Sequence, residues 1–313
     1  MGKGRKIIYQ LGLLGLSILA VQYLWKPLYE KGLILFAHSS TGNSFIHQFY
    51  QLTGYDILQE DMLNMWMISG FGGCLLMGSI CGICDIFLPI HFKTQQSRSY
   101  FTLKEWIHAV TVSLCNLFIS SWIVSLPYSY LKKSNPAIDP VLSNQEFILH
   151  VEVIKFVLSV GIVEVWFFFT HWLLHQPPFY SFIHKIHHRF KAPIAVASMY
   201  AHPVEFVGGN LLGVVLGPIL TRCHPLTSFV WIHNALMSTG GSHSGYKMFY
   251  AEFHDAHHQY FDYNFGIGEF RSHSSLTHIS FLLVGGQLDA FFGTLWEGSE
   301  KWKQLEAKKT KKT

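Results

Sequence analysis

The segment WFFFTHWLLHQPPFYSFIHKIHHR, residues 166–189, joins the end of a long apolar run to two closely spaced histidine motifs. The first motif is H-x-x-x-H and the second is H-x-x-H-H, and another H-x-x-H-H follows further along the chain. On a helix, positions i, i+3 and i+4 lie within one narrow arc, so each motif is predicted to aim its imidazoles in one direction. The eight histidines of the three motifs are His171, His175, His184, His187, His188, His254, His257 and His258.

This histidine spacing predicts metal ligation. A neutral imidazole donates a lone pair near pH 7, and neutral ligands limit the fixed charge at a site beside lipid. Isolated histidines such as His38 and His108 are instead expected to be packing residues. A single structural zinc takes four ligands, and the zinc-protease motif H-E-x-x-H is absent, so this many imidazoles indicate two ions. Imidazole suits iron, zinc, copper and nickel, so the residues themselves leave the metal open.

Two further histidines are predicted ligands. His202 precedes Pro203, which suits the first position of a helix, so His202 is expected to cap that helix. His243 lies in a glycine- and serine-rich stretch, residues 240–246, that can fold its ring back onto a metal. Acidic side chains commonly orient such ligands from behind. Three candidates for this role are Glu164, Glu205 and Asp255.

The composition indicates a membrane protein. Of the 313 residues, 50% are hydrophobic and 13% are charged, whereas soluble domains have about 25% charged residues. The formal net charge of +4 is small, and the basic residues form no stripe, which argues against nucleic-acid binding.

Apolar runs predict membrane spans near residues 7–25, 62–90, 106–126 and 147–170, and an apolar hairpin with arms at 204–220 and 226–237. Basic residues before the first span favour a cytosolic N-terminus. Four crossings then bring His171 to the cytosol, and the hairpin returns the chain to the same side before His243. Charges inside a span cost roughly 2.5–3.5 kcal/mol each, so Glu152 and Lys155, one turn apart, are expected to neutralise each other.

The predicted fold is therefore all-α, a polytopic membrane helical bundle with a cytosolic, histidine-rich di-metal catalytic cap. Three regions are expected: an N-terminal transmembrane region (1–146), a histidine-bearing domain (147–296) and a basic C-terminal tail (297–313). The tail ends in K-x-K-x-x (Lys309–Thr313), which fits a cytosolic retrieval signal of the endoplasmic reticulum or a simple solvated basic tail.

Taken together, the motifs resemble those of the fatty acid hydroxylase/sterol desaturase superfamily of membrane di-iron oxygenases. The resemblance covers about residues 147–294, and the pieces AHPVE and HSGY are similar to the C4-methylsterol oxidase branch. The segments that carry it are HWLLH (171–175), HKIHHRFKAP (184–193), YAHPVE (200–205), HSGY (243–246) and FHDAHH (253–258).

The resemblance implies an endoplasmic-reticulum enzyme with its catalytic face in the cytosol. Two iron ions, held by the ten histidines, would use O2 to hydroxylate a sterol C–H bond. The electrons would come from NAD(P)H through cytochrome b5 or a reductase. That donor must be a separate protein, because the chain has no H-P-G-G haem motif.

Two alternatives stay open at this point. A fatty acyl or sphingoid lipid hydroxylase or desaturase would use the same metal site, and a non-catalytic regulator could retain the fold. The chain also departs from the family pattern: about twenty extra residues, 267–287, separate Asn264-Phe265-Gly266 from the ending Leu288–Thr294.

Overall fold

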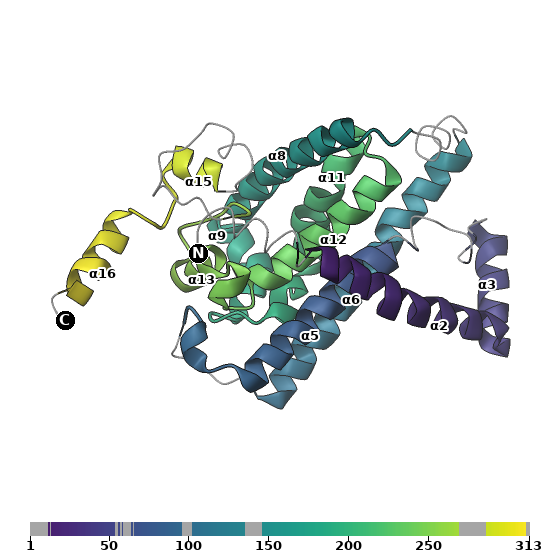
Figure 1. Ribbon diagram of the computed structural model, residues 1–313, viewed down its shortest axis with the longest axis horizontal. Helices are drawn as coiled ribbons and strands as arrows, with labels where there is room; N and C mark the ends of the chain where they lie inside the picture. Colours follow the sequence, from purple (N-terminus) through teal and green to yellow (C-terminus); the bar gives the residue numbers. More distant parts are fainter. Residues whose placement is uncertain are drawn as a thin grey trace.

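The computed structural model describes residues 12, 14–53, 56, 58, 64, 66–95, 102–134, 146–268 and 286–310. Within these ranges the regular structure is helical, without strands, apart from one isolated antiparallel β-bridge between Lys93 and Tyr246 (Figure 1). The all-α prediction is confirmed.

Four helical stretches of the described chain are long and apolar enough to cross a membrane: Trp66–Phe87, Leu103–Pro127, Leu149–Leu174 and Pro203–Thr221. They contain, in order, α5 (Gly72–Phe87), α6 (Leu103–Ser134), α8 (Leu149–Leu174) and α11 (Leu212–Thr221). Their positions confirm the predicted multi-pass architecture.

The first predicted span, residues 7–25, lies partly outside the described residues. Its described end does not stop at Trp25, as expected, but continues through a π-helical turn into α2 (Lys26–His38), which α3 (Ser40–Thr53) follows. Pro27 lies at the second position of α2, directly after this π-helical turn.

The predicted hairpin is formed by α11 and α12 (Pro225–Ser242). Its turn is fastened to the start of α8: Lys155 donates to the Arg222 carbonyl at 2.9 Å, and the His224 N–H donates to Glu152 at 2.9 Å. Glu152 and Lys155 also pair at 2.6 Å, as predicted. The turn and the start of α8 therefore share one end of the bundle, which leaves the histidine-bearing ends of α8 and α12 at the other.

Close packing of α8 against α11 sets the spacing at that histidine-bearing end, and the two helices run side by side in Figure 1. Gly213 and Gly217, four residues apart, face α8: a Cβ on Gly217 would lie 2.6 Å from Ser159 Cβ, and one on Gly213 would lie 3.2 Å from the Trp166 ring. Small residues at this spacing let helix backbones approach closely in lipid. The Trp166 indole N–H completes the contact with a 2.9 Å hydrogen bond to the Gly208 carbonyl.

The N-terminal spans support the segment that precedes α11. Asn116 of α6 donates to the carbonyls of Met199 and Ala201, at 2.8 and 3.1 Å, and Ser113 donates to the Val196 carbonyl at 2.6 Å. This loop and the remaining short helices lie at the histidine-bearing end. Those helices are α9 (Pro177–Phe179), α10 (Pro203–Glu205), α13 (Glu252–Tyr260) and α15 (Gln287–Phe292).

The C-terminal region follows as α16 (Glu300–Thr310). Most of the 267–287 insertion and the last three residues of the K-x-K-x-x motif lie outside the described residues.

Candidate metal centre

Four separate segments deliver histidines to one place. His171 lies in the last turns of α8 and His175 caps it, while His243 caps α12. The second motif, His184–His188, follows a π-helical turn (Tyr180–His184) and enters a 3-10 turn. The third motif, His254–His258, lies on α13, the regular helix that the spacing predicts.

The structure gathers nine of the ten predicted ligands into two groups. In each group, the candidate ligand atoms lie within 4.8 Å of one another, and all the side chains are buried except the half-buried His175. Group one consists of His171, His175, His184, His188 and His257. Group two consists of His187, His243, His254 and His258.

The grouping corrects one sequence expectation, because neither H-x-x-H-H motif aims its three rings at one point. His184 and His188 enter group one and His187 enters group two; His254 and His258 share group two, while His257 enters group one. On a helix, residues i and i+4 differ by about 40° around the axis, whereas i+3 lies about 100° from i+4. Each motif therefore serves both groups and fixes the distance between them.

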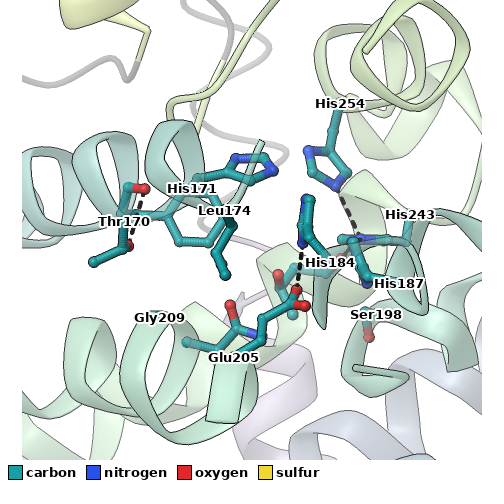
Figure 2. Close-up of a pocket in the computed structure, with 13 residues that line it drawn as sticks. Thr170, His171, Leu174, His184, His187, Ser198, Glu205, Gly209, His243 and His254 are labelled. Carbon is teal, nitrogen blue, oxygen red and sulfur yellow. Dashed lines mark hydrogen bonds and ion pairs between the residues drawn. The ribbon is translucent and has the colours of Figure 1, made fainter. Parts of the chain in front are cut away.

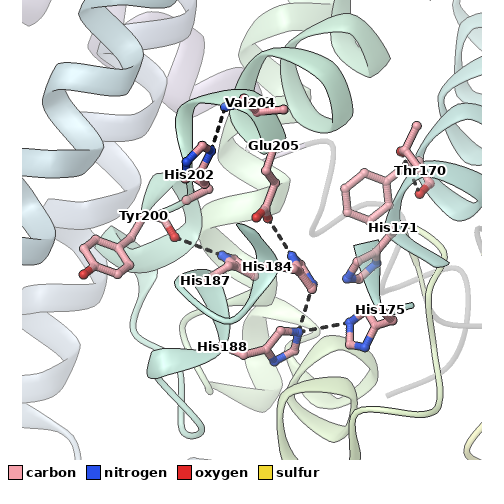
Figure 3. Close-up of polar contacts among 12 residues, drawn as sticks. Thr170, His171, His175, His184, His187, His188, Tyr200, His202, Val204 and Glu205 are labelled. Carbon is pink, nitrogen blue, oxygen red and sulfur yellow. Dashed lines mark hydrogen bonds and ion pairs between the residues drawn. The ribbon is translucent and has the colours of Figure 1, made fainter. Parts of the chain in front are cut away.

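Within each group the Nε2 atoms converge. In group one, His188 Nε2 lies 3.0 Å from that of His184 and 3.2 Å from that of His175 (Figure 3). It also lies 3.1 Å from that of His257. In group two, His254 Nε2 lies 2.9 Å from that of His243 and 3.1 Å from that of His258. The Nε2 atoms of His187 and His243 are 3.2 Å apart.

In two histidines of each group, Nδ1 is turned outward to a backbone carbonyl. In group one, Nδ1 of His171 bonds to the Phe265 carbonyl at 2.8 Å and that of His257 to the Tyr263 carbonyl at 2.6 Å. In group two, Nδ1 of His187 bonds to the Tyr200 carbonyl at 3.2 Å and that of His243 to the Thr239 carbonyl at 2.8 Å. A carbonyl can only accept, so each Nδ1 carries the proton and each neutral ring points an Nε2 lone pair into its group.

These contacts fit a metal ion in each group. Lone pairs facing one another at about 3 Å cannot hydrogen-bond and repel, unless a shared cation binds them. Metal–imidazole bonds of about 2.0–2.1 Å place neighbouring ligand nitrogens about 3.0–3.4 Å apart, close to the spacing seen here. The donor set is entirely nitrogen, which suits iron and other first-row transition metals rather than magnesium or calcium.

Burial keeps the rings in the neutral form that ligation needs. Loss of hydration on burial lowers the pKa of His187 to about 4 and that of His175 to about 2. The same cause holds the pKa of the remaining histidines outside the spans well below the ordinary value: His184, His188, His243, His254, His257 and His258. Both groups are thus uncharged at neutral pH.

The three predicted acidic partners have different surroundings. Glu205 is buried and accepts from His184 Nδ1 at 2.9 Å, as expected of an orienting carboxylate (Figure 2). Glu164 instead accepts from the backbone N–H groups of Ile267 and Gly286, at 3.0 and 2.8 Å, so its expected hydrogen bond to a histidine is replaced by a backbone clamp. Asp255 is buried on α13, and its role beside the ligands stays a prediction.

His202 is the predicted ligand that neither group includes. Its Nδ1 accepts a 3.2 Å hydrogen bond from the Val204 N–H, which makes it the helix cap expected before Pro203 (Figure 3). This contact occupies Nδ1 and leaves His202 outside both groups, and its role as a ligand stays a prediction. His233, one of the other histidines, is buried between Ser17 Oγ at 2.8 Å and the Ser69 carbonyl at 3.2 Å, as a packing residue would be.

A small cavity lies against both groups (Figure 2). It offers 20 Å³ to the centres of water-sized molecules, which is room for about one such molecule. Histidines of both groups line it, together with apolar Phe167 and Leu174 of α8 and the polar residues Thr170, Ser198, Asn210 and Thr239. The cavity therefore connects the histidines with the ends of the apolar helices.

The oxygen atoms behind the ligands have no signal in the sequence. The carbonyls of Tyr200, Thr239, Tyr263 and Phe265 belong to residues whose side chains carry no signal for this role. The motif Asn264-Phe265-Gly266 and the later Asp289 were visible as family-like pieces, but their contact with each other depends on tertiary structure.

Comparison with known proteins places these features in a family context. Residues 156–271 match the family model described as fatty acid hydroxylase. The chain is 32% identical over 251 residues to the human fatty acid hydroxylase domain-containing protein 2, covering 78% of this chain and 70% of that one.

Two further relatives carry names of enzymes. Methylsterol monooxygenase 1 of Gallus gallus is 33% identical over 244 residues, 72% of this chain and 75% of the relative. A fatty acid hydroxylase of Mycosarcoma maydis is 30% identical over 171 residues, 53% and 43% of the two chains. No solved structure matches the chain.

Proposed function

Since this chain belongs to the fatty acid hydroxylase family, in the branch that resembles C4-methylsterol oxidases, we propose that it is a membrane di-iron monooxygenase that hydroxylates a sterol. Membership of this family supports the proposal that the chain is a lipid-oxidising, multi-pass membrane enzyme. The two irons, the sterol substrate and the electron donor are our proposal.

The observation that carries the proposal is the pair of buried, all-histidine groups at the ends of apolar helices. Nine imidazoles in two groups provide sites for two ions, and the donor set suits iron. Bound iron would supply the redox chemistry that an unactivated C–H bond requires. The balanced reaction is RH + O2 + 2 e⁻ + 2 H⁺ → ROH + H2O.

The chain's own residues contribute orientation, dryness and proton handling. The carbonyls behind Nδ1 keep two rings of each group in the tautomer whose Nε2 faces that group. Glu205 does the same for His184 with Oε1, while its buried Oε2 has no hydrogen-bond partner in the described chain and can hold a proton beside the cavity. Burial excludes bulk water, which protects a reactive oxidant from wasteful reduction.

The cavity supports a lipid that presents an oxygen atom near the attacked carbon. It meets the apolar residues Phe167 and Leu174 near the end of a spanning helix, so a substrate can approach from the bilayer. Ser198, Asn210 and Thr239 add hydrogen-bonding groups beside the histidines. A 4-methylsterol carries its hydroxyl on the carbon next to the methylated one, and it is the substrate class that we propose.

We propose that the catalytic face lies on the cytosolic side of the endoplasmic-reticulum membrane. Exposed basic residues flank the histidine-bearing end, and an excess of Lys and Arg favours the cytosolic side. They are Lys185, Arg189, Lys191 and Lys247. Electrons derived from NAD(P)H would then reach the site from a separate cytosol-facing donor, cytochrome b5 or a reductase.

Lipid analysis of cells that lack the protein tests the proposal. We expect 4-methylsterols to accumulate, the wild-type chain to restore normal levels, and the double variant His187→Ala plus His257→Ala, one ligand from each group, to restore nothing while remaining folded. Glu300→Gln, on exposed α16, is the matched control and is expected to restore sterol levels fully.

The other outcomes identify the alternatives. Accumulation of non-hydroxylated acyl chains or sphingoid bases, with normal sterols, would assign the chain to fatty acyl or sphingoid hydroxylation. Full rescue by the double variant would contradict catalysis and indicate a regulator that retains the fold.

A further inference from the structure

One short backbone segment, Tyr263–Ile267, stands behind two ligands of group one. The Tyr263 carbonyl accepts from His257 Nδ1 at 2.6 Å, and the Phe265 carbonyl accepts from His171 Nδ1 at 2.8 Å. Both carbonyls belong to residues outside any helix, and Asn264 between them has a positive φ of 59°. Regular structure therefore does not fix these two acceptors, so other contacts must.

Asp289 provides the strongest of these contacts. Its side chain is fully buried at 0% exposure. Oδ1 accepts from the Phe265 N–H at 2.8 Å, and Oδ2 accepts from the Gly266 N–H at 2.7 Å. The Thr294 hydroxyl also donates to Oδ1, at 2.7 Å. The carboxylate thus accepts from the N–H groups of Phe265 and Gly266 and holds the Phe265 carbonyl toward His171.

Neighbouring contacts complete the clamp. Glu164 of α8 accepts from the Ile267 N–H at 3.0 Å, directly after the two amides held by Asp289. Gly266 lies between the two acids: a Cβ there would be 2.8 Å from Glu164 Oε1 and 2.9 Å from Asp289 Oδ2. Asn264 donates its side-chain N–H to the Phe253 carbonyl at 2.8 Å and so ties the segment to the start of α13.

The Nδ1 contacts of His187 and His243 in group two use none of these residues. His243 bonds to Thr239 within the end of its own helix α12, and His187 bonds to Tyr200, whose neighbouring carbonyls Asn116 holds. The Nδ1 acceptors of His171 and His257 therefore lie in the Tyr263–Ile267 segment, whereas the acceptors of the two group-two rings lie elsewhere in the chain.

We propose that Asp289 is a positioning residue for group one, which acts with Glu164 through the Tyr263–Ile267 backbone to hold His171 and His257 ready for the metal. Asp289 lies outside residues 156–271, which match the family model. Its side-chain contacts described above include none of the ligands. This inference rests on the metal site of the proposed function, and it is independent of which lipid is oxidised.

The test is selective metal loss in Asp289→Asn, a change that keeps the size of the side chain. The amide NH2 of the asparagine replaces one acceptor oxygen and faces a backbone N–H. Two hydrogen-bond donors then meet without an acceptor between them. Full-length protein in detergent is loaded with Co²⁺ and titrated with a chelator while its visible absorption is followed. We expect two ions per chain in the wild type. In the variant we expect one ion to be released about 10–100-fold more readily and the other to be held as before.

Two controls separate positioning from general damage. Asp262→Asn removes an exposed carboxylate from the adjacent position and is expected to leave both ions bound. Gly217→Ala loosens the packing of α11 on α8 far from group one, so it is expected to lower the melting temperature without selective release of one ion. If Asp289→Asn fails to fold, Thr294→Val removes only the hydroxyl that holds Oδ1 and is expected to show the same selectivity in weaker form.

If the wild type binds two ions, two results for Asp289→Asn would overturn this inference alone. The variant would either hold both ions as tightly as the wild type or lose both in parallel. A wild type that binds no pair of ions would overturn the proposed function as well.

Discussion

The hydrogen bond between Glu205 and His184 gives a quantitative prediction. Glu205 is 3% exposed and accepts from His184 Nδ1 at 2.9 Å. A hydrogen bond to a charged group contributes about 1.5–3 kcal/mol and a neutral one about 1 kcal/mol, so Glu205→Gln, which keeps an acceptor oxygen, is expected to cost about 0.5–2 kcal/mol of metal binding. Because 1.4 kcal/mol corresponds to a tenfold change, metal affinity in group one should fall about 2- to 30-fold.

Glu205→Ala is expected to have the larger effect. It leaves the His184 Nδ1–H buried without an acceptor, and the loss should approach the 100-fold limit typical of such outer partners. The assay is a chelator competition against the loaded protein in detergent. Glu152→Gln, which changes another buried glutamate at the opposite end of α8, is the matched control and should reduce stability but not metal affinity. Wild-type affinity in both Glu205 variants, or an equal loss in Glu152→Gln, would refute the reasoning.

Three other predictions follow from the packing and the charges. Gly217→Ala places a Cβ 2.6 Å from Ser159 Cβ and is expected to destabilise the protein by about 1–3 kcal/mol, seen as a lower melting temperature, whereas Gly161→Ala, which has nothing within 4 Å, should not; equal melting temperatures would contradict the packing. Metal-free protein should lose stability as the pH falls below about 6.5, because the histidines of the unfolded chain then bind protons. The buried histidines of the folded chain bind protons only at lower pH, since burial lowers the pKa of His187 to about 4. A melting temperature that stays constant between about pH 7 and 5 would exclude this. Excision of residues 269–285 should leave both ions bound, because Glu164 already holds Ile267 and Gly286 together; loss of metal on excision would show that the removed residues support the site.

Much of the fold followed from local sequence pattern. The spans are long apolar runs, and the charged pair Glu152–Lys155 was predictable because both residues lie one turn apart on one helix. The third histidine motif forms the regular helix α13 that its spacing predicts. His202 was correctly predicted as a helix cap from Pro203, a local signal, while its ligand role depended on a distance that no local pattern encodes.

The parts that escaped prediction are long-range contacts. The spacing H-x-x-H-H gives the angular order of three rings but not the existence of two separate centres, which appear only when α8, α12 and α13 meet. Glu164 lies two turns before His171 on α8, yet it reaches the backbone at Ile267 and Gly286, more than a hundred residues away. Backbone carbonyls are present at every residue, so nothing in the sequence marks Phe265 or Tyr263 as partners of ligands.

The central claim is that the nine histidines hold two metal ions at one end of a membrane bundle. Its most direct test is the iron content of full-length protein, reconstituted with Fe²⁺ without oxygen and freed of loosely bound metal. We expect two ions per chain in the wild type, and one in either His188→Ala of group one or His254→Ala of group two. A wild type that retains no pair of ions, or variants that retain as much metal as the wild type, would contradict it.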